Sequence, residues 1–355
     1  MKEGLNIRKG KEIISSKMEQ LKFPGWSCPE EDTVNQESNP GVPSPSLARV
    51  MESPCKEIEY NTLEKILERS NMQKALHRVE SNKGCSGIDG IGQKEIRKHL
   101  KENWLEIKEK ILKGMYTPEA ALRVEIRKDG GGMRELSIPT LTDRLIQQGI
   151  LQILNPIFEP LFSDFSYGFR ERRNAHQAVE KARAYIEEGY RYVVDLDIEK
   201  FFDRVNHDIL MSRLSQEIKD KRVLKLIGKY LRSGIMLNGC CINREEGTPQ
   251  GSPLSPLLSN IILNDLDREL EKRGHKFVRY ADDCNIYVRS RRAGERVKES
   301  IEKFLERKLR LKCNQAKSGV DKISQRSFLG FNFSNERVPK IRLSRKAKKK
   351  FKKNV

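Results

Sequence analysis

Apolar positions recur at helical spacing from about residue 57 to about residue 113. A glycine-rich interruption at residues 83–90 divides this part into two predicted helical stretches. The recurring apolar residues of the first stretch are Leu63, Ile66, Met72, Leu76 and Val79. Such spacing is typical of helices that bury one face against a core.

Alternation of apolar and polar positions predicts strands further along the chain. Residues 123–127 and 136–138 alternate on either side of a glycine-rich stretch at 129–132, which predicts a β-hairpin. A helical pattern begins near residue 143, and a second one ends near residue 187.

A strand predicted over residues 190–198 has two chemically different faces. Its period of two places Val194, Leu196 and Ile198 on one face. Asp195 and Asp197 fall on the other face, so the strand presents carboxylates opposite its apolar side.

A helix that begins at Ser255 is predicted next, with Ser255 as its N-cap and a stop at residues 272–274. Its apolar face consists of Leu258, Ile262, Leu266 and Leu270. Residues 277–280 and 285–288 form a second predicted hairpin, whose turn contains Ala281, Asp282 and Asp283. An amphipathic helix over 297–309 and a strand over 338–343 follow.

These patterns divide the chain into four predicted parts. Residues 1–55 are rich in proline and predict a flexible extension, and residues 56–115 predict a helical part. Residues 116–335 hold the predicted strands and helices of the main body, and residues 336–355 are strongly basic.

The charge of the chain indicates the kind of partner it binds. Its 69 Lys and Arg against 50 Asp and Glu give a net charge of +19. This balance indicates a polyanionic partner. Residues 342–355 contain no acid, and this run is equally compatible with a solvated charge cluster and a nucleic-acid contact.

Other features exclude several classes of protein. No apolar run reaches the roughly 18 residues of a membrane span, and the N-terminus lacks a secretory pattern. The seven cysteines form no CxxC pair, which argues against a disulfide framework or a zinc site. We therefore expect a cytoplasmic protein without a membrane partner.

Three carboxylates carry the candidate chemistry. If the strand ending at Asp197 neighbours the hairpin of Asp282 and Asp283, the three acids converge, and divalent cations relieve their repulsion. Two Mg²⁺ ions held there could activate a primer 3′-hydroxyl and stabilise a pyrophosphate leaving group. Lys128 and Arg134, near the glycine-rich hairpin loop, could bind the triphosphate. Taken singly, each pair is also compatible with ordinary solvated surface residues.

Three segments strongly resemble the palm motifs of group II intron reverse transcriptases, in the order of that family. They are residues 195–203 (DLDIEKFFD), 247–256 (GTPQGSPLSP) and 280–283 (YADD). The resemblance extends over about residues 60–345. It implies a member of that family with an α+β right-hand polymerase fold, in which fingers and palm contain an antiparallel palm sheet.

The resemblance also implies roles for single residues. Asp197, Asp282 and Asp283 match the metal-binding aspartates, with the Ile198 carbonyl as an extra ligand, and Asp195 is the rival for the first position. Phe202 matches the aromatic residue that excludes the ribose 2′-hydroxyl, although a plain core aromatic is the alternative.

Further matches concern the substrate. Gln250 resembles the residue that lines the nascent base-pair pocket, Lys128 and Arg134 resemble the triphosphate-binding pair, and Lys317 resembles a basic residue behind the catalytic hairpin. The remaining matched arginines fit either a template-bracing role or structural ion pairs, and they are Arg144, Arg170 and Arg173.

The implied function is RNA-directed DNA synthesis from dNTPs on a DNA primer annealed to an RNA template, with two Mg²⁺ ions. Structured intron RNA is an expected partner, and the oligomeric state is left open. The family continues into a helical thumb or maturase domain, so we expect a chain truncated at the start of that domain. The alternatives are a maturase-like RNA-binding protein without enzymatic activity and an inactive remnant; an RNA-dependent RNA polymerase fits Phe202 less well.

Overall fold

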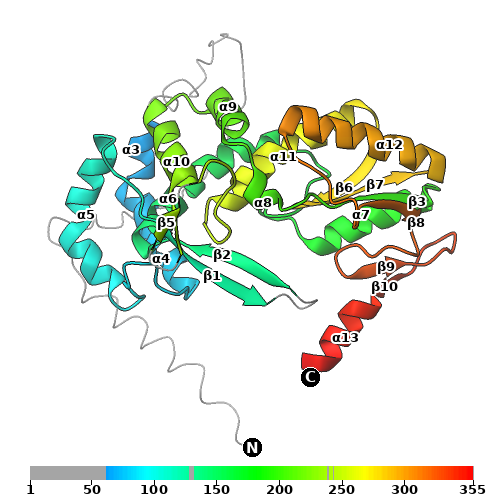
Figure 1. Ribbon diagram of the computed structural model, residues 1–355, viewed down its shortest axis with the longest axis horizontal. Coiled ribbons are helices and arrows are strands. Elements are labelled where there is room, and N and C mark those ends of the chain that lie inside the picture. Colours follow the sequence, from blue (N-terminus) through cyan, green and yellow to red (C-terminus); the bar gives the residue numbers. More distant parts are fainter. Residues whose placement is uncertain (1–60, 128–131, 238–239, 243, 355) are drawn as a thin grey trace, which may run out of the picture. The chain divides into compact units, whose positions relative to one another are not determined.

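Figure 1 shows the fold, a computed structural model that describes residues 61–127, 132–237, 240–242 and 244–354. The extension predicted over residues 1–55 lies outside these residues. The described part contains two four-stranded sheets and a two-stranded sheet, with helices packed around them. Across that same part, no helix is both long enough and apolar enough to cross a membrane.

The N-terminal part is helical, as its apolar spacing predicts. Its helices are α3 (Thr62–Ile66), α4 (Arg69–Ser81) and α5 (Ile96–Leu112). They pack against α6 (Leu141–Phe158), whose N-cap Thr140 accepts a hydrogen bond from the Asp143 N–H. The buried Asp143 carboxylate also accepts from Tyr116 Oη at 2.7 Å, which ties the chain leaving α5 to α6.

The first four-stranded sheet has the order β2-β1-β4-β5. Its strands are β1 (Ala121–Arg127), β2 (Met133–Ile138), β4 (Ile235–Leu237) and β5 (Cys240–Ile242). The predicted hairpin is confirmed, since β1 and β2 pair antiparallel from Leu122 opposite Ile138 to Arg127 opposite Met133. Parallel pairing of β1 with β4 then widens the hairpin into a sheet.

The second four-stranded sheet has the order β6-β7-β3-β8, and each neighbouring pair is antiparallel. Its strands are β3 (Tyr192–Leu196), β6 (Lys276–Tyr280), β7 (Asp283–Val288) and β8 (Gly319–Lys322). The predicted strand and hairpin are therefore confirmed. The antiparallel order brings two segments almost 90 positions apart in the sequence into neighbouring central strands.

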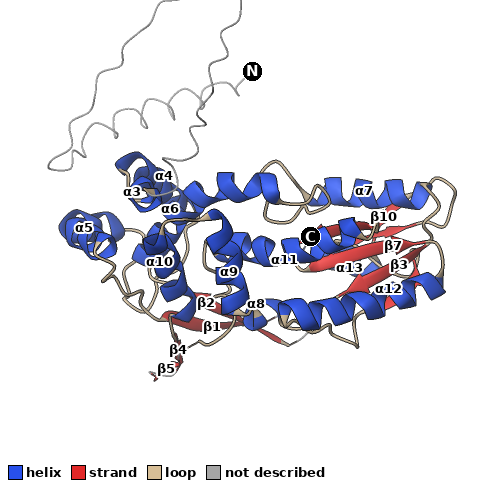
Figure 2. Cartoon of the chain, turned by 90° about the horizontal axis from the view of Figure 1, so that it is seen from above, coloured by secondary structure: helices blue, strands red, loops and turns tan. Residues whose placement is uncertain are grey.

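Helices cover both faces of this sheet (Figure 2). On one face lie α11 (Ser255–Lys272) and α12 (Arg291–Phe304), which enclose Val194, Leu196 and Ile198 in the main core. On the other lies α7 (Ala175–Glu187), which packs with Val193. The alternation predicted for the strand is thus satisfied, with the face of Asp195 and Asp197 directed away from the main core.

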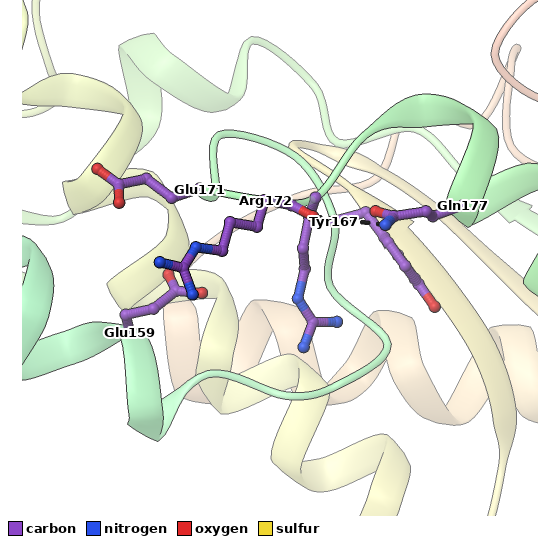
Figure 3. A pocket seen from close by; sticks show the side chains of 6 residues that line it. Glu159, Tyr167, Glu171, Arg172 and Gln177 are labelled. Carbon is purple, nitrogen blue, oxygen red and sulfur yellow. Dashed lines mark hydrogen bonds between the residues drawn. The ribbon is translucent and has the colours of Figure 1, made fainter.

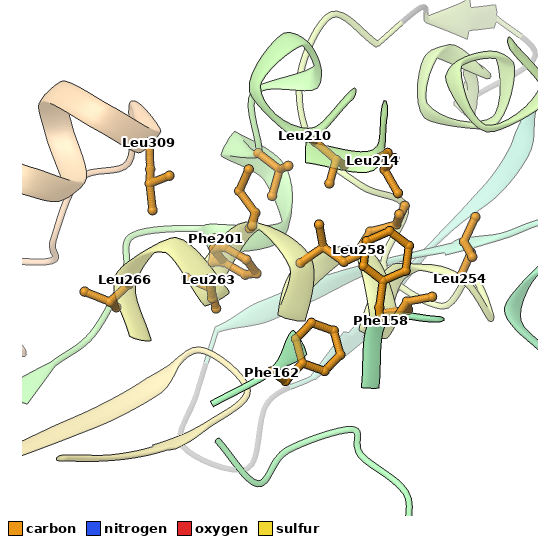
Figure 4. Packing of buried hydrophobic residues seen from close by; sticks show 14 of the residues in the cluster. Phe158, Phe162, Phe201, Leu210, Leu214, Leu254, Leu258, Leu263, Leu266 and Leu309 are labelled. Atoms are coloured by element: carbon orange, nitrogen blue, oxygen red, sulfur yellow. The ribbon is translucent and has the colours of Figure 1, made fainter. Parts of the chain in front are cut away.

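Helix α11 is the central element of the main core (Figure 4). Its predicted apolar residues are all buried, among them Leu258 and Leu266. The prediction that Ser255 caps this helix is wrong, because Leu254 occupies the N-cap position without a side-chain cap. The Ser255 hydroxyl instead donates to the Pro249 carbonyl at 2.8 Å and holds the preceding loop against the helix.

The remaining elements connect these layers. They are a 3₁₀ turn (Glu159–Leu161), α8 (Phe201–Arg204), α9 (His207–Glu217), α10 (Lys221–Arg232), a π-helical turn (Leu305–Leu309), β9 (Phe331–Phe333), β10 (Ile341–Leu343) and α13 (Arg345–Asn354). The helix predicted to end at residue 309 therefore ends in the π-helical turn. The strand predicted over 338–343 is shorter, and it pairs antiparallel with β9.

The burial of α11 leads to a stability prediction. Leu263 is fully buried in the main core, so Leu263→Ala is expected to lower the free energy of unfolding by about 2–5 kcal/mol through reduced burial and a residual cavity. Chemical denaturation followed by circular dichroism measures this change. Leu105→Ala is the control, because Leu105 is 83% exposed and its truncation is expected to change the free energy by no more than about 0.5 kcal/mol. Equal effects would contradict the assignment of α11 to the core.

Candidate active site

The pairing of β3 with β7 brings the candidate carboxylates together. Asp195 lies opposite Asn285 and Leu196 opposite Cys284. One further step in the same register sets Asp197 opposite Asp283, at the point where β6 and β7 turn through Ala281 and Asp282. The convergence expected from the sequence is therefore present in the backbone.

The Asp283 carboxylate lies in a locally acidic environment, although the residue is exposed at the end of its strand. Neighbouring protein atoms exclude part of the water from the Asp283 carboxylate, and this desolvation is the largest cause that raises its pKa to about 6. Repulsion from Asp282 is the next cause. Asp195 and Asp197 add to this repulsion, whereas Lys317 opposes it. Such mutual repulsion is what a bound cation relieves.

Asp197 is held by the loop that precedes β8. Its N–H donates to Ser318 Oγ at 3.0 Å, and its carbonyl accepts from the Asn314 N–H at 2.8 Å. The Lys317 ammonium lies 3.3 Å from the Asp197 carboxylate, with 66% of the lysine side chain exposed. Ile198 is buried, and its backbone lies opposite Cys313.

Asp195 has a different set of partners from Asp197. Arg326 binds the Asp195 carboxylate at 3.2 Å and Asp321 at 2.7 Å, and it also donates to the Lys317 carbonyl. Burial is the main cause that raises the pKa of Asp195, with Arg326 acting against it. The contact with Arg326 favours Asp197 over Asp195 as the ligand of the pair, and this assignment stays a prediction.

The donor set fits a hard divalent cation in its chemistry. Carboxylate and carbonyl oxygens are the ligands that Mg²⁺ prefers, and the Lys317 ammonium already provides positive charge at Asp197. Among the described residues, no three acidic, histidine or cysteine side chains are arranged to hold an ion as they stand.

Phe202 and Gln250 belong to neighbouring segments. The Phe202 carbonyl accepts from the Thr248 N–H at 2.6 Å, and the Phe202 ring is half-buried and edge-on to Phe201 with 5.3 Å between centroids. Gln250 Nε2 donates to Asp203 Oδ1 at 3.2 Å, while the Gln250 carbonyl accepts from the Ser137 N–H at 2.7 Å. The loop of Gln250 thus joins α8 to strand β2.

The predicted triphosphate pair is described only in part. Lys128 lies outside the described residues, and of Arg134 only the backbone is described, opposite Ile126 in the β1–β2 hairpin. Both therefore stay predictions.

The three matched arginines make internal contacts. The Arg170 side chain is 4% exposed, binds Glu159 at 2.8 Å and donates to the Ser166 carbonyl. Arg173 binds Asp164 at 2.8 Å, and Arg144 donates to the Pro139 and Cys85 carbonyls. These contacts favour the structural alternative for Arg170 above all.

A hollow of about 650 Å³ lies beside the Tyr167 segment (Figure 3). Its lining carries both signs of charge, from Glu159, Glu171, Arg172 and Arg173. The residues that line it do not include Asp197, Asp282 or Asp283.

Sequence reasoning missed a buried polar group beneath the cluster. Arg279, Asp267 and Asn260 are almost completely buried, and the first two form an ion pair. A signal existed in the sequence, because Asn260 and Asp267 occur at helical spacing with the buried Leu263 and Leu270 of α11. Polar residues on an apolar face indicate buried partners.

Comparisons with known proteins agree with this geometry. The profile of the family described as reverse transcriptase (RNA-dependent DNA polymerase) matches residues 126–333. Protein YkfC of Escherichia coli is 30% identical over 298 residues, which cover 73% of this chain and 77% of YkfC. The group II intron-encoded protein LtrA of Lactococcus lactis is 30% identical over 349 residues, covering 78% of this chain and 57% of LtrA.

A solved structure supports the fold alone. Telomerase from Candida albicans, in complex with a fragment of telomeric RNA, matches with a TM-score of 0.50 at 14% identity. The match covers 70% of this chain and 51% of the telomerase chain. The predicted fingers and palm with an antiparallel palm sheet are confirmed.

Proposed function

Because this chain belongs to the group II intron reverse transcriptase family, we propose that it is an RNA-directed DNA polymerase. The proposed reaction adds dNTPs to the 3′-hydroxyl of a DNA primer annealed to an RNA template. The observation that supports the proposal is the register of β3 and β7, whose end pair, Leu196 opposite Cys284, adjoins Asp197 on one strand and Asp283 on the other. Structured intron RNA is a further proposed partner.

The family uses divalent metal ions, and we propose two Mg²⁺ ions held by the carboxylates of Asp197, Asp282 and Asp283 and by the Ile198 carbonyl. Bound there, such ions supply Lewis-acid activation of the primer hydroxyl and stabilisation of the leaving pyrophosphate. The contribution of the chain is to hold the acids close together and oriented. The charge of Lys317 reduces the repulsion between them, and the Asn314 and Ser318 bonds fix the backbone of Asp197.

Other side chains are proposed to act on the substrate. Phe202 excludes a 2′-hydroxyl by steric contact, and Gln250 lines the pocket of the new base pair. Their proximity through the 247–251 loop supports a shared pocket, since Thr248 bonds to Phe202 and Gln250 to Asp203. Lys128 and Arg134 are proposed to bind the triphosphate from the β1–β2 hairpin.

A basic surface near the C-terminal helix supports nucleic-acid binding. A hollow of about 490 Å³ lies between the 324–332 segment and the start of α13. Its lining includes the cations Arg342, Arg345, Lys346 and Lys348 and, within the described part, no acid. Such a surface suits the phosphate backbone of a template-primer duplex. The same surface would serve the second candidate function, a non-enzymatic maturase-like RNA-binding protein.

Asp282→Asn tests the polymerase proposal against that alternative. The rate of dNTP incorporation is expected to fall at least about a thousandfold, because the variant lacks one of the carboxylates proposed to hold the metal ions that stabilise the transition state. Primer extension on an RNA template with Mg²⁺ measures the change. Glu306→Gln removes the same charge from an exposed position of the π-helical turn and is expected to incorporate normally. RNA binding without incorporation by the folded unmodified chain would support the maturase-like alternative instead.

Phe202→Ala tests the proposed sugar selection. Removal of the ring is expected to raise the ratio of NTP to dNTP incorporation by about tenfold or more, the scale that one steric contact supplies. Single-nucleotide extension with dNTPs and NTPs in parallel measures the ratio. An unchanged ratio in a variant that still incorporates dNTPs would assign the ring to the core alone.

Arg345→Ala/Lys346→Ala/Lys348→Ala tests the basic surface. Duplex affinity is expected to fall, and the slope of log K against log salt is expected to decrease by about 1 for each phosphate that the variant no longer binds. Fluorescence anisotropy over a salt series measures both quantities. The triple variant Lys219→Ala/Lys221→Ala/Lys225→Ala removes equal charge at and beside α10, and its slope is expected to match that of the unmodified chain.

A further inference from the structure

A fully buried ion pair lies beneath the turn that carries Asp282 and Asp283. The side chains of Arg279 and Asp267 are both 0% exposed, and two parallel hydrogen bonds of 2.7 and 2.6 Å join them. Arg279 lies in β6, and Asp267 projects from α11. Two charges removed from water require this complete pairing, because each one alone carries a large desolvation cost.

The guanidinium reaches beyond its acid to the turn itself. Arg279 Nη1 donates to the Ala281 carbonyl at 2.8 Å and to Asn260 Oδ1 at 3.0 Å. Ala281 directly precedes the two proposed metal ligands. The ion pair therefore fixes the last peptide before the acidic residues to helix α11.

Asn260 extends the same network to a third segment. Its Nδ2 donates to the Gly168 carbonyl at 2.9 Å, and the Tyr167 N–H donates to the Arg279 carbonyl at 2.9 Å. Gly168 lies so close to the turn that a Cβ atom there would stand 2.2 Å from the Ala281 nitrogen. Helix α11, the turn and the 167–168 segment thus form one connected unit.

The turn held by this unit has an unfavourable backbone conformation. Ala281 has a φ of +56°, in the left-handed region that a residue with a Cβ rarely adopts. Such a conformation persists only where the surroundings impose it. The two-residue loop between the paired Tyr280 and Asp283 calls for a positive φ at its first residue. The bond from Arg279 to the Ala281 carbonyl and the close approach of Gly168 hold the turn in that conformation from below.

We propose that Arg279, together with Asp267 and Asn260, is a positioning residue that sets the location of the Asp282 and Asp283 carboxylates. The proposal rests on the polymerase function proposed above. Because Asp267 neutralises Arg279 at hydrogen-bond distance, the contribution of the arginine to the site is geometric. The network acts through the turn and does not touch substrate.

The alternative is that the pair only stabilises the fold. Replacing a buried ion pair by apolar residues of similar volume is often neutral or stabilising, whereas removing one partner leaves an uncompensated charge. The double variant Arg279→Met/Asp267→Leu therefore removes the network while the core stays filled. It separates positioning from stability, which either single variant would not do.

The experiment compares the double variant with the unmodified chain in primer extension, thermal unfolding and hydrogen exchange. The folded variant is expected to lose about tenfold to a hundredfold in kcat, the scale of a displacement near 1 Å at the reacting centre. The KM for dNTP is expected to stay within about twofold, because the substrate contacts are elsewhere. Amides of residues 279–284 are expected to exchange faster. A folded variant with unchanged kcat and unchanged exchange would overturn the proposal.

Two further variants complete the design. Arg273→Met/Glu269→Leu removes a more exposed ion pair from the same end of α11 and is expected to leave kcat and the exchange of residues 279–284 unchanged. If the main double variant does not fold, Asn260→Leu, which keeps the ion pair, takes its place. Its kcat and the amide exchange of residues 279–284 are then compared with those of the unmodified chain. An unmodified chain without incorporation would overturn the polymerase proposal, while the exchange comparison would still decide the positioning of the turn.

Discussion

The pairing of β3 with β7 is the interaction on which the candidate site depends. Its register joins Asp195 to Asn285 and Leu196 to Cys284, and thereby sets the ends of the two strands side by side. Because side chains alternate between faces, a slip of one residue would turn Asp197 into the main core and Leu196 out of it. Burial of the apolar face against α11 and α12 opposes such a slip. The hydrophobic core therefore determines where the carboxylates lie.

Charge is distributed so that an acidic centre lies within a basic protein. The net charge of +19 favours approach of a polyanion. Around Asp283, by contrast, loss of hydration first and repulsion from neighbouring acids second raise the pKa of that residue. Arg326 neutralises Asp195, and Lys317 lies against Asp197 from an exposed position. An exposed lysine can move aside for a cation at little cost, whereas an arginine shared between two acids is held. This difference separates the acid that serves structure from the acid proposed to bind metal.

The sequence predicted most of what depends on local pattern. The alternation of Val194 with Asp195 and the four-residue spacing of Leu258 and Leu266 report which face is buried, and the structure confirms both. The sequence did not predict the side-chain contacts that a residue makes outside its own helix or strand. Serine is a common N-cap residue, yet the Ser255 hydroxyl donates a hydrogen bond to the Pro249 carbonyl. The ion pair of Arg279 joins a strand to a helix. The position of Asp267 on the apolar face of α11 indicates a buried partner, but the helix pattern does not identify that partner as Arg279.

The loop at 247–251 extends this argument from the metal site to substrate selection. The Gln250 carbonyl binds the Ser137 N–H of strand β2, and its side chain binds Asp203 in α8 beside Phe202. Gly251 has a φ of +112° and approaches the Ser137 carbonyl so closely that a Cβ atom there would stand 2.9 Å from that oxygen. A displacement of the β1–β2 hairpin is therefore transmitted to both residues proposed to line the pocket. If the hairpin binds the triphosphate as proposed, these contacts couple its position to the space available to the sugar and the base.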